Sequence, residues 1–215
     1  MDAVKSFFET PAPSRYSGIL SWLITTDHKR IGLLYLYSVG FWFLLGILLG
    51  GLIRLELMFI GETVLTADVY NSVFTLHGVI MIFLFIIPAL PAIFGNFFLP
   101  IQIGTDDVFF PKLNLLSWYL YMFGGALAIY SLFSDGFADT GWTFYVPFSI
   151  STHTNVTSTV FAAFILGMAS MLTGLNFITT VHRMPKPQMG WLQIPLFTWT
   201  LYATSWVQLL STPVV

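Results

Sequence analysis

The sequence has no cysteine and very few charged residues. Of 215 residues, 8 are Lys or Arg and 10 are Asp or Glu, or 8% charged, where soluble domains carry about 25%. Without cysteine there is no disulfide framework, thiolate metal site or cysteine nucleophile. A net charge of −2 gives no basis for nucleic-acid binding, and 22 Phe, 7 Trp and 9 Tyr exclude disorder. So few charges cannot cover a soluble fold, which leaves a polytopic membrane protein embedded in the lipid bilayer.

Long apolar stretches predict an all-α fold, a polytopic transmembrane bundle of five helices. A helix needs about 20 apolar residues to cross a bilayer, and the crossing segments must be helical because lipid offers the backbone no hydrogen-bonding partner. Residues 1–30 are expected to form a cytoplasmic or interfacial segment and residues 31–215 the bundle. The predicted spans are residues 31–53, 72–100, 113–133, 157–180 and 195–215, with the second bent at Pro88 and Pro91.

The positions of Lys and Arg predict an orientation, because cytoplasmic loops carry an excess of them. Seven of the eight lie before the first span, between the second and third, or between the fourth and fifth, which are on one side of a five-span chain. They are Lys5, Arg15, Lys29, Arg30, Lys112, Arg183 and Lys186. The other side holds only Arg54. We therefore expect the N-terminus in the cytoplasm and the end of the fifth span outside.

His77 is the only titratable side chain in the predicted second span. It lies roughly 9 Å below the interface at about 1.5 Å per residue, a costly depth that indicates a function. The residue is either a neutral imidazole bonded to a neighbouring helix or an axial ligand of haem, and Gly78 leaves no side chain to hinder a flat macrocycle. Arg54, at the end of the first span, either snorkels or pairs with Glu56, or forms hydrogen bonds to the polar edge of a cofactor.

Carboxylates and amides gather where the second span ends and the third begins: Asn96, Asp106, Asp107 and Asn114. The carboxylates can be helix caps, or they can collect protons and pass them to a water chain. Polar stripes at helical spacing also run along the fourth and fifth spans. They are Ser170, Thr173, Asn176 and Thr180, and Thr200, Thr204, Gln208 and Ser211. Such stripes join helices or line a water path.

Six separated motifs resemble the haem–copper oxygen reductases, in the order and spacing of subunit I of cytochrome c oxidase. They are TTDHKRIG at 25–32, LIRLEL at 52–57, LHGVIMIF at 76–83, GNFFLPIQIGTDDVFFPKLN at 95–114, DTGWTFYVP at 139–147 and NFITTVHRM at 176–184. The resemblance extends from about Thr25 to the last residue and is to the type with a D-type proton pathway. It implies that the five helices are part of a larger twelve-helix bundle.

The resemblance implies roles for single residues around a low-spin haem, expected to be haem A. His77 matches the axial ligand in the second helix of the family. Arg54 matches the arginine that hydrogen-bonds the haem formyl group, and Trp142 matches the tryptophan of a turn near the haem on the outer side. Glu56 matches a position that some members use for a bound cation. The second haem and copper B would be bound by residues outside this chain.

The resemblance also implies a proton pathway that begins in this chain. Asp107 matches the aspartate at the entrance of the D pathway, and Asn96 and Asn114 match the two asparagines beside it. Ser170 matches one of a serine pair further along, where Ala169 replaces the other. Asp106 stands where the family has proline, so the mouth is expected to be more acidic.

Several family residues are absent from the chain: the helix-six glutamate, the three copper B histidines, the cross-linked tyrosine, the K pathway and the further haem ligands. We therefore expect an enzyme part that is inactive alone, either a split subunit I or a fragment. With its remainder and subunits II and III, in a bacterial inner membrane, it would reduce O2 with electrons from cytochrome c and pump protons. Val69 and Ser72 replace a His and a Gln that quinol-oxidising relatives have shortly before the haem histidine, and this favours cytochrome c as the electron donor. The alternatives are an inert paralogue acting as scaffold or assembly factor, or part of a nitric-oxide-reducing relative.

Overall fold

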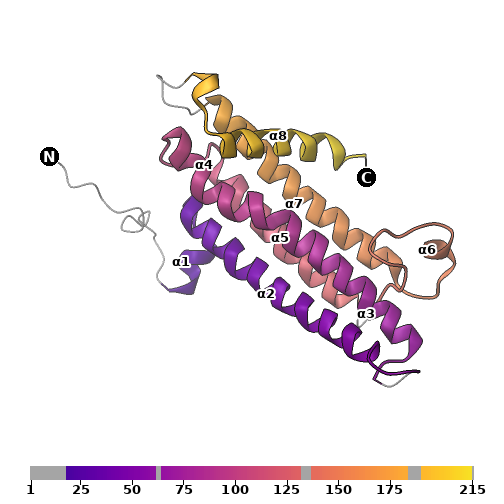
Figure 1. Ribbon diagram of the computed structural model, residues 1–215. Coiled ribbons are helices and arrows are strands. Elements are labelled where there is room, and N and C mark those ends of the chain that lie inside the picture. The colour runs from indigo at the N-terminus through magenta and orange to yellow at the C-terminus, as the bar shows by residue number, and fades with distance from the viewer. Residues whose placement is uncertain (1–17, 62–63, 132–136, 184–189, 215) are drawn as a thin grey trace. The chain divides into compact units, whose positions relative to one another are not determined.

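The computed structural model describes residues 18–61, 64–131, 137–183 and 190–214, and most of these residues are helical (Figure 1). The elements are α1 (Ile19–Leu23), α2 (His28–Glu56), α3 (Ala67–Val79), the π-helices η1 (Ile80–Ile86) and η2 (Ala89–Gly95), α4 (Asn96–Ile103), α5 (Pro111–Tyr130), α6 (Phe148–Ser151), α7 (Val156–Arg183), the 3-10 helix η3 (Trp191–Gln193) and α8 (Leu196–Ser211). Within those ranges the only β-pairing is an isolated bridge between Phe137 and Asn155, so the all-α prediction is confirmed there.

Among the described residues, four helices are long and apolar enough to cross a membrane, and they correspond to the first four predicted spans. They are His28–Glu56, the continuous stretch Ala67–Ile103, Pro111–Tyr130 and Val156–Arg183. The fifth predicted span contains α8, which has 16 residues and a length of about 24 Å, less than the apolar thickness of about 30 Å. Five spans are therefore not confirmed, and the orientation stays a prediction. Residues 1–17, 132–133 and 215 of the predicted segments lie outside the described residues.

The second long helix departs from α-helical geometry near the two prolines that predicted a bend. The π-helix η1 ends two residues before Pro88, and Pro91 lies inside η2. Because proline has no N–H, Pro88 cannot donate the α-helical hydrogen bond to the carbonyl of Leu84. The hydroxyl of Tyr121 on α5 donates to that carbonyl over 2.7 Å. A buried side chain from another helix therefore satisfies the backbone group that the proline leaves free.

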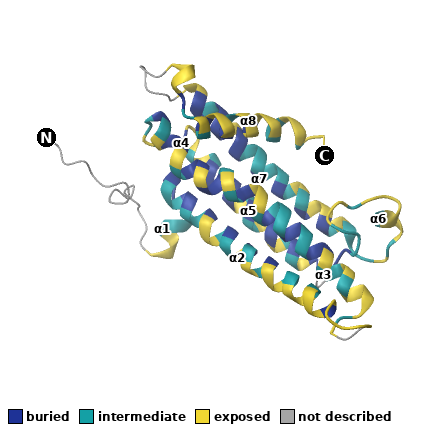
Figure 2. Ribbon diagram, viewed as in Figure 1, coloured by how far each residue is buried: buried dark blue, intermediate teal, exposed yellow. Residues whose placement is uncertain are grey.

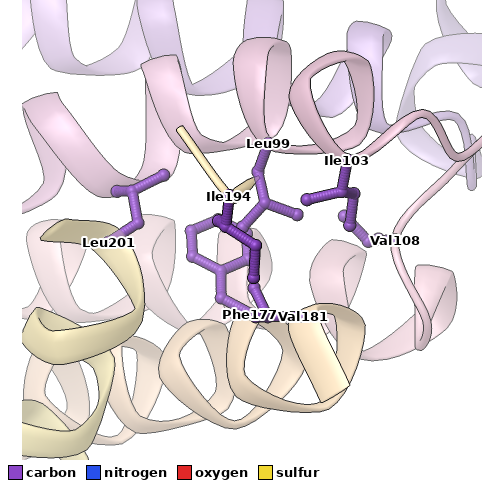
Figure 3. Close-up of a cluster of buried hydrophobic side chains, with 7 residues drawn as sticks. All are labelled: Leu99, Ile103, Val108, Phe177, Val181, Ile194 and Leu201. Atoms are coloured by element: carbon purple, nitrogen blue, oxygen red, sulfur yellow. The ribbon is translucent and has the colours of Figure 1, made fainter. Parts of the chain in front are cut away.

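The chain divides into two compact units, each of which we describe by itself. Unit 1 combines Met1–Leu36, of which residues 18–36 are described, with Leu90–Trp118 and Ser170–Val215. Its core is a cluster of buried apolar side chains from α4, α7, α8 and the adjoining segments (Figure 3): Leu99, Ile103, Val108, Phe177, Val181, Ile194 and Leu201. Since Val108 belongs to this core, the loop that carries Asp107 is fixed to it.

Unit 2 combines Tyr37–Ala89 with Tyr119–Ala169, and glycines allow its helices to approach closely. A Cβ atom at Gly124 of α5 would lie 2.8 Å from the side chain of Leu166 on α7, and the neighbouring glycine, Gly125, faces Trp42 of α2. Small residues at such contacts are typical of helices that pack inside membranes.

Exposed residues recur along α2 (Figure 2), and many of them are apolar. Phe41, Leu44 and Leu48 are all more than half exposed, at 58%, 62% and 65%. A soluble protein rarely leaves so continuous an apolar surface uncovered. A helix in lipid can expose it, because the lipid tails are themselves apolar. The exposure pattern and the length of α2 therefore both indicate a helix that crosses a membrane.

Candidate functional site

The imidazole of His77 is held by the backbone of α2. Its Nδ1 lies 2.9 Å from the carbonyl oxygen of Gly46, and since a carbonyl can only accept, Nδ1 carries the proton. The tautomer therefore leaves the lone pair on Nε2, the nitrogen that can bind a metal. This contact is the hydrogen bond to a neighbouring helix that the simpler interpretation of His77 predicts, and it is also how metal-ligating histidines are oriented.

Glycines border His77 on both sides. A Cβ at Gly50, one turn after Gly46 on α2, would lie 3.1 Å from Cε1 of His77. A Cβ at Gly78, the next residue on α3, would lie 2.9 Å from Cδ1 of Trp142. The helix of His77 can thus approach both α2 and the turn of Trp142 only because these positions lack side chains.

The chemistry of this site fits a haem better than a metal ion held by several side chains. Within the described ranges no group of three or more His, Cys, Asp or Glu residues could hold a metal ion. A haem needs from this chain only one neutral imidazole nitrogen, which His77 supplies with its tautomer fixed. His77 and its surroundings therefore suit one ligand of a haem iron, and the other protein ligand would come from elsewhere.

Arg54 and Glu56 end α2 in different environments. Arg54 is exposed, whereas Glu56 is buried and its Oε2 accepts hydrogen bonds from the backbone N–H of Val64 at 2.7 Å and Leu65 at 2.9 Å. The carboxylate of Glu56 therefore organises the loop that follows α2. The guanidinium of Arg54 has the exposure that either snorkelling or binding a polar group requires.

Trp142 lies in the DTGW turn, residues 139–142, which is attached to α3. The N–H of Gly141 donates to Oγ1 of Thr75 over 2.9 Å, and the ring of Trp142 lies edge-on to Phe83 with 6.3 Å between centroids. The indole is 40% exposed. The turn thus brings Trp142 beside the residue that follows His77.

Asp107 caps a helix, but not the one that follows it in sequence. Its Oδ1 accepts the N–H of Val108 over 2.7 Å, and its carboxylate also accepts the backbone N–H of His28, the first residue of α2. The carboxylate of Asp107 thus acts as a cap for α2. Burial raises the pKa of Asp107, and the charge of Asp27 raises it further, against the opposing effects of His28 and the two N–H groups. A raised pKa brings the carboxyl closer to exchanging protons near neutral pH.

Asn96 and Asn114 lie together, as their predicted roles require. The side-chain amide of Asn114 donates to Oδ1 of Asn96 over 2.6 Å, and that of Asn96 donates to the carbonyl of Ala92 over 2.6 Å. The Nδ1–H of His28 donates to the backbone carbonyl of Asn96, also over 2.6 Å. Both asparagines are fully buried, and His28 connects them to the N-terminus of α2 beside Asp107.

Two residues of this polar line were not predicted from the sequence. Ser117 donates its hydroxyl to the carbonyl of Asn114 over 2.7 Å, so the hydroxyl of Tyr35 donates to Ser117 over 2.9 Å. Thr173 also approaches that hydroxyl, and Ser170 lies three residues earlier on the same side of α7. The signal in the sequence was the spacing of Ser117, three residues after Asn114, and a tyrosine in an apolar span.

The polar stripe of α7 joins it to the Asp107 loop. Oγ1 of Thr180 accepts the N–H of Phe109 over 3.0 Å, and Asn176 forms two hydrogen bonds with the backbone of Phe110. The predicted stripe of α8 differs, because its first residue, Thr200, is exposed. The buried serine of this helix is Ser205, which does not belong to that stripe. The first stripe therefore joins α7 to the loop before α5, whereas the second mostly faces outward.

Comparisons with a family profile and with single proteins indicate the same kind of protein. The profile of the family described as cytochrome C and Quinol oxidase polypeptide I matches residues 30–215. Cytochrome c oxidase subunit 1 of Thermostichus vulcanus is 42% identical over 190 residues, covering 88% of this chain and 34% of that protein. The subunit 1 of Bacillus subtilis (strain 168) is 39% identical over 205 residues, covering 95% and 33%. That of Cereibacter sphaeroides is 34% identical over 227 residues, covering 90% and 40%. The chain spans about a third of the length of these relatives.

Proposed function

Because the chain belongs to the cytochrome c and quinol oxidase polypeptide I family, we propose that it forms the N-terminal part of the catalytic subunit of a terminal oxidase. It is a multi-pass membrane protein, and its described part contains four helices suited to crossing a bilayer. The assembled enzyme takes electrons from cytochrome c, reduces O2 to water and pumps protons. The relatives named cytochrome c oxidase support this donor.

His77 is the proposed axial ligand of a low-spin haem, of the A type. The hydrogen bond from its Nδ1 to Gly46 is the observation that carries the proposal, because it presents Nε2 as the coordinating nitrogen. When bound, the haem supplies one-electron transfer towards the site of oxygen reduction. Arg54 would offer its guanidinium to a polar group of the haem, and Trp142 covers the end of α3 next to Gly78.

The residues around Asp107 are the proposed mouth of a proton pathway. Asp107 exchanges protons with the water on the cytoplasmic side, and its raised pKa supports that role. Asn96, Asn114 and Ser170 then border a line of water molecules. In the described chain, Oδ1 of Asn114 is buried without a hydrogen-bond partner, and such an atom favours a bound water. The contacts of Ser117 and Tyr35 extend this polar line.

The remaining groups come from other polypeptide segments. Residues outside this chain bind the second haem and copper B, and the partners are the rest of subunit I and subunits II and III. The N-terminus lies in the cytoplasm of a bacterium, on the side with most Lys and Arg. Two alternatives remain, an inert scaffold or a nitric-oxide-reducing relative. The acidic entrance at Asp107 favours the oxidase over the second.

Purification of the membrane complex that contains this chain tests the proposal. We expect a low-spin haem α-band in the reduced spectrum and oxygen uptake with reduced cytochrome c. A complex without haem would identify a scaffold. A complex with haem that reduces nitric oxide and not O2 would identify the nitric-oxide-reducing alternative. Either result would contradict the proposed oxidase.

A further inference from the structure

One side of α3 carries three residues that hold a second segment of unit 2, residues 137–142. Ser72, Thr75 and Gly78 are three residues apart and therefore share this side of the helix. His77 is about 100° away from Gly78 around the helix axis, and it faces Gly46 and Gly50 of α2. The helix that carries His77 is therefore held on two different sides.

Each of the three positions makes its own contact with the segment. Oγ of Ser72 donates to the carbonyl of Phe137 over 3.0 Å. Thr75 accepts the N–H of Gly141 over 2.9 Å, and Gly78 touches the ring of Trp142, because a Cβ there would lie 2.9 Å from it. The contacts follow the same order along both segments, so residues 137–142 run along α3 in a single register.

Thr75 is the central residue of this contact. It is fully buried, and its hydroxyl uses both of its functions, donating to the carbonyl of Asn71 over 2.8 Å while accepting from Gly141. The φ angle of Gly141 is +78°, a left-handed conformation that glycine adopts most readily. A valine at position 75 would have nearly the same shape as threonine but could not accept the Gly141 N–H.

We propose that Thr75 is a positioning residue for the haem site, acting through the DTGW turn. By fixing Gly141 it places Trp142 against Gly78, and so sets the surroundings of the imidazole of His77 on the adjacent helical face. The inference rests on the proposed role of His77 as haem ligand. Thr75 itself touches neither the iron nor the substrate.

Hydrogen–deuterium exchange of the purified complex tests the contact directly. Loss of one buried hydrogen bond costs about 1.4 kcal/mol, which is about tenfold in an opening equilibrium. We expect the Gly141 amide to exchange about tenfold faster in Thr75→Val than in the parent, and Thr75→Ser, which keeps the hydroxyl, to restore slow exchange. Exchange in Thr75→Val at the parent rate would overturn the inference.

The haem spectrum and midpoint potential test the consequence. We expect Thr75→Val to shift both while retaining the haem, and Thr75→Ser to resemble the parent. Unchanged values despite fast exchange would overturn the positioning role. If Thr75→Val does not assemble, Gly78→Ala, which displaces Trp142 and leaves the hydroxyl in place, must shift the same two properties or the inference fails. A low-spin haem that persists in His77→Ala would instead contradict the proposed ligand, while the exchange result would stand.

Discussion

The side-chain amide of Asn114 on α5 donates a 2.6 Å hydrogen bond to Oδ1 of Asn96 on α4. Neither asparagine has any exposed surface, and burying amides in an apolar protein is favourable only when they are hydrogen-bonded. Asn114 continues the line to Ser117 and Tyr35, while its own Oδ1 lacks a partner among the described residues. This pair therefore fits a polar path that includes water.

Removing the hydroxyl of Tyr35 should slow proton delivery. Tyr35→Phe preserves the ring but leaves Ser117 without its donor, so we expect slower oxygen uptake with normal haem content, together with a loss of stability of about 1 kcal/mol. Tyr37→Phe is the matched control, because Tyr37 is 72% exposed two residues later on α2. Equal oxygen uptake in the two variants would remove Tyr35 from the path.

Replacing Asp107 separates helix capping from proton transfer. Asn keeps a side-chain oxygen that can accept a backbone hydrogen bond but cannot exchange a proton. Asp107→Asn should therefore assemble with normal haem content while oxygen uptake falls at least tenfold, about 1.4 kcal/mol of added barrier. Proton release in vesicles should also be lost. Asp106→Asn, at the exposed neighbouring residue, should have a far smaller effect. Parent-like uptake and pumping in Asp107→Asn would reduce Asp107 to a cap of α2.

The raised pKa of Asp107 also predicts how stability depends on pH. The folded protein binds this proton more tightly than the unfolded chain, so the stabilisation is complete below the ordinary carboxyl pKa. It is lost as pH rises through the raised folded value. Asp107→Asn has no such loss, and its melting temperature relative to the parent should increase as pH rises above the ordinary carboxyl pKa. Thermal unfolding of the solubilised complex measures this difference, and a decrease would show a lowered pKa.

Adjacent glycines on α2 provide a test of the His77 environment. In Gly50→Ala the new methyl group would lie 3.1 Å from Cε1 of His77, whereas nothing lies within 4 Å at Gly51. We expect Gly50→Ala to shift the low-spin haem band and cost about 1–3 kcal/mol of stability through overpacking. Gly51→Ala should keep the band and gain up to about 1 kcal/mol from helix propensity. Identical spectra would show that the contact does not constrain the imidazole.

The sequence predicts the long helices better than it predicts their contacts. Uninterrupted apolar runs locate α2 and α7 within a few residues, because length and hydropathy determine a crossing helix. Helical period alone does not say which face another helix covers, so the spacing places Thr200 on a polar stripe although it is exposed and Ser205 is the buried residue. The sequence leaves Asp107 as either a helix cap or a proton collector. Its hydrogen bond with the N–H of His28 could not be predicted, because the approach of the α2 N-terminus is a tertiary contact.

The same limit applies to the candidate site. The depth of His77 in an apolar span indicates a function, but Gly46 as the partner of its Nδ1 depends on how α2 and α3 pack. Tyr35 could not be distinguished from other aromatic residues of α2 until Ser117 was found beside it.

The reduced-minus-oxidised spectrum of the assembled complex carrying His77→Ala tests the central claim most directly. An axial imidazole determines the spin state of its haem iron, so we predict that the low-spin α-band disappears and electron transfer from cytochrome c stops. His153→Ala, at an exposed histidine of the segment before α7, is the matched control and should retain the band. A normal low-spin band in His77→Ala would contradict the assignment of His77 as the haem ligand.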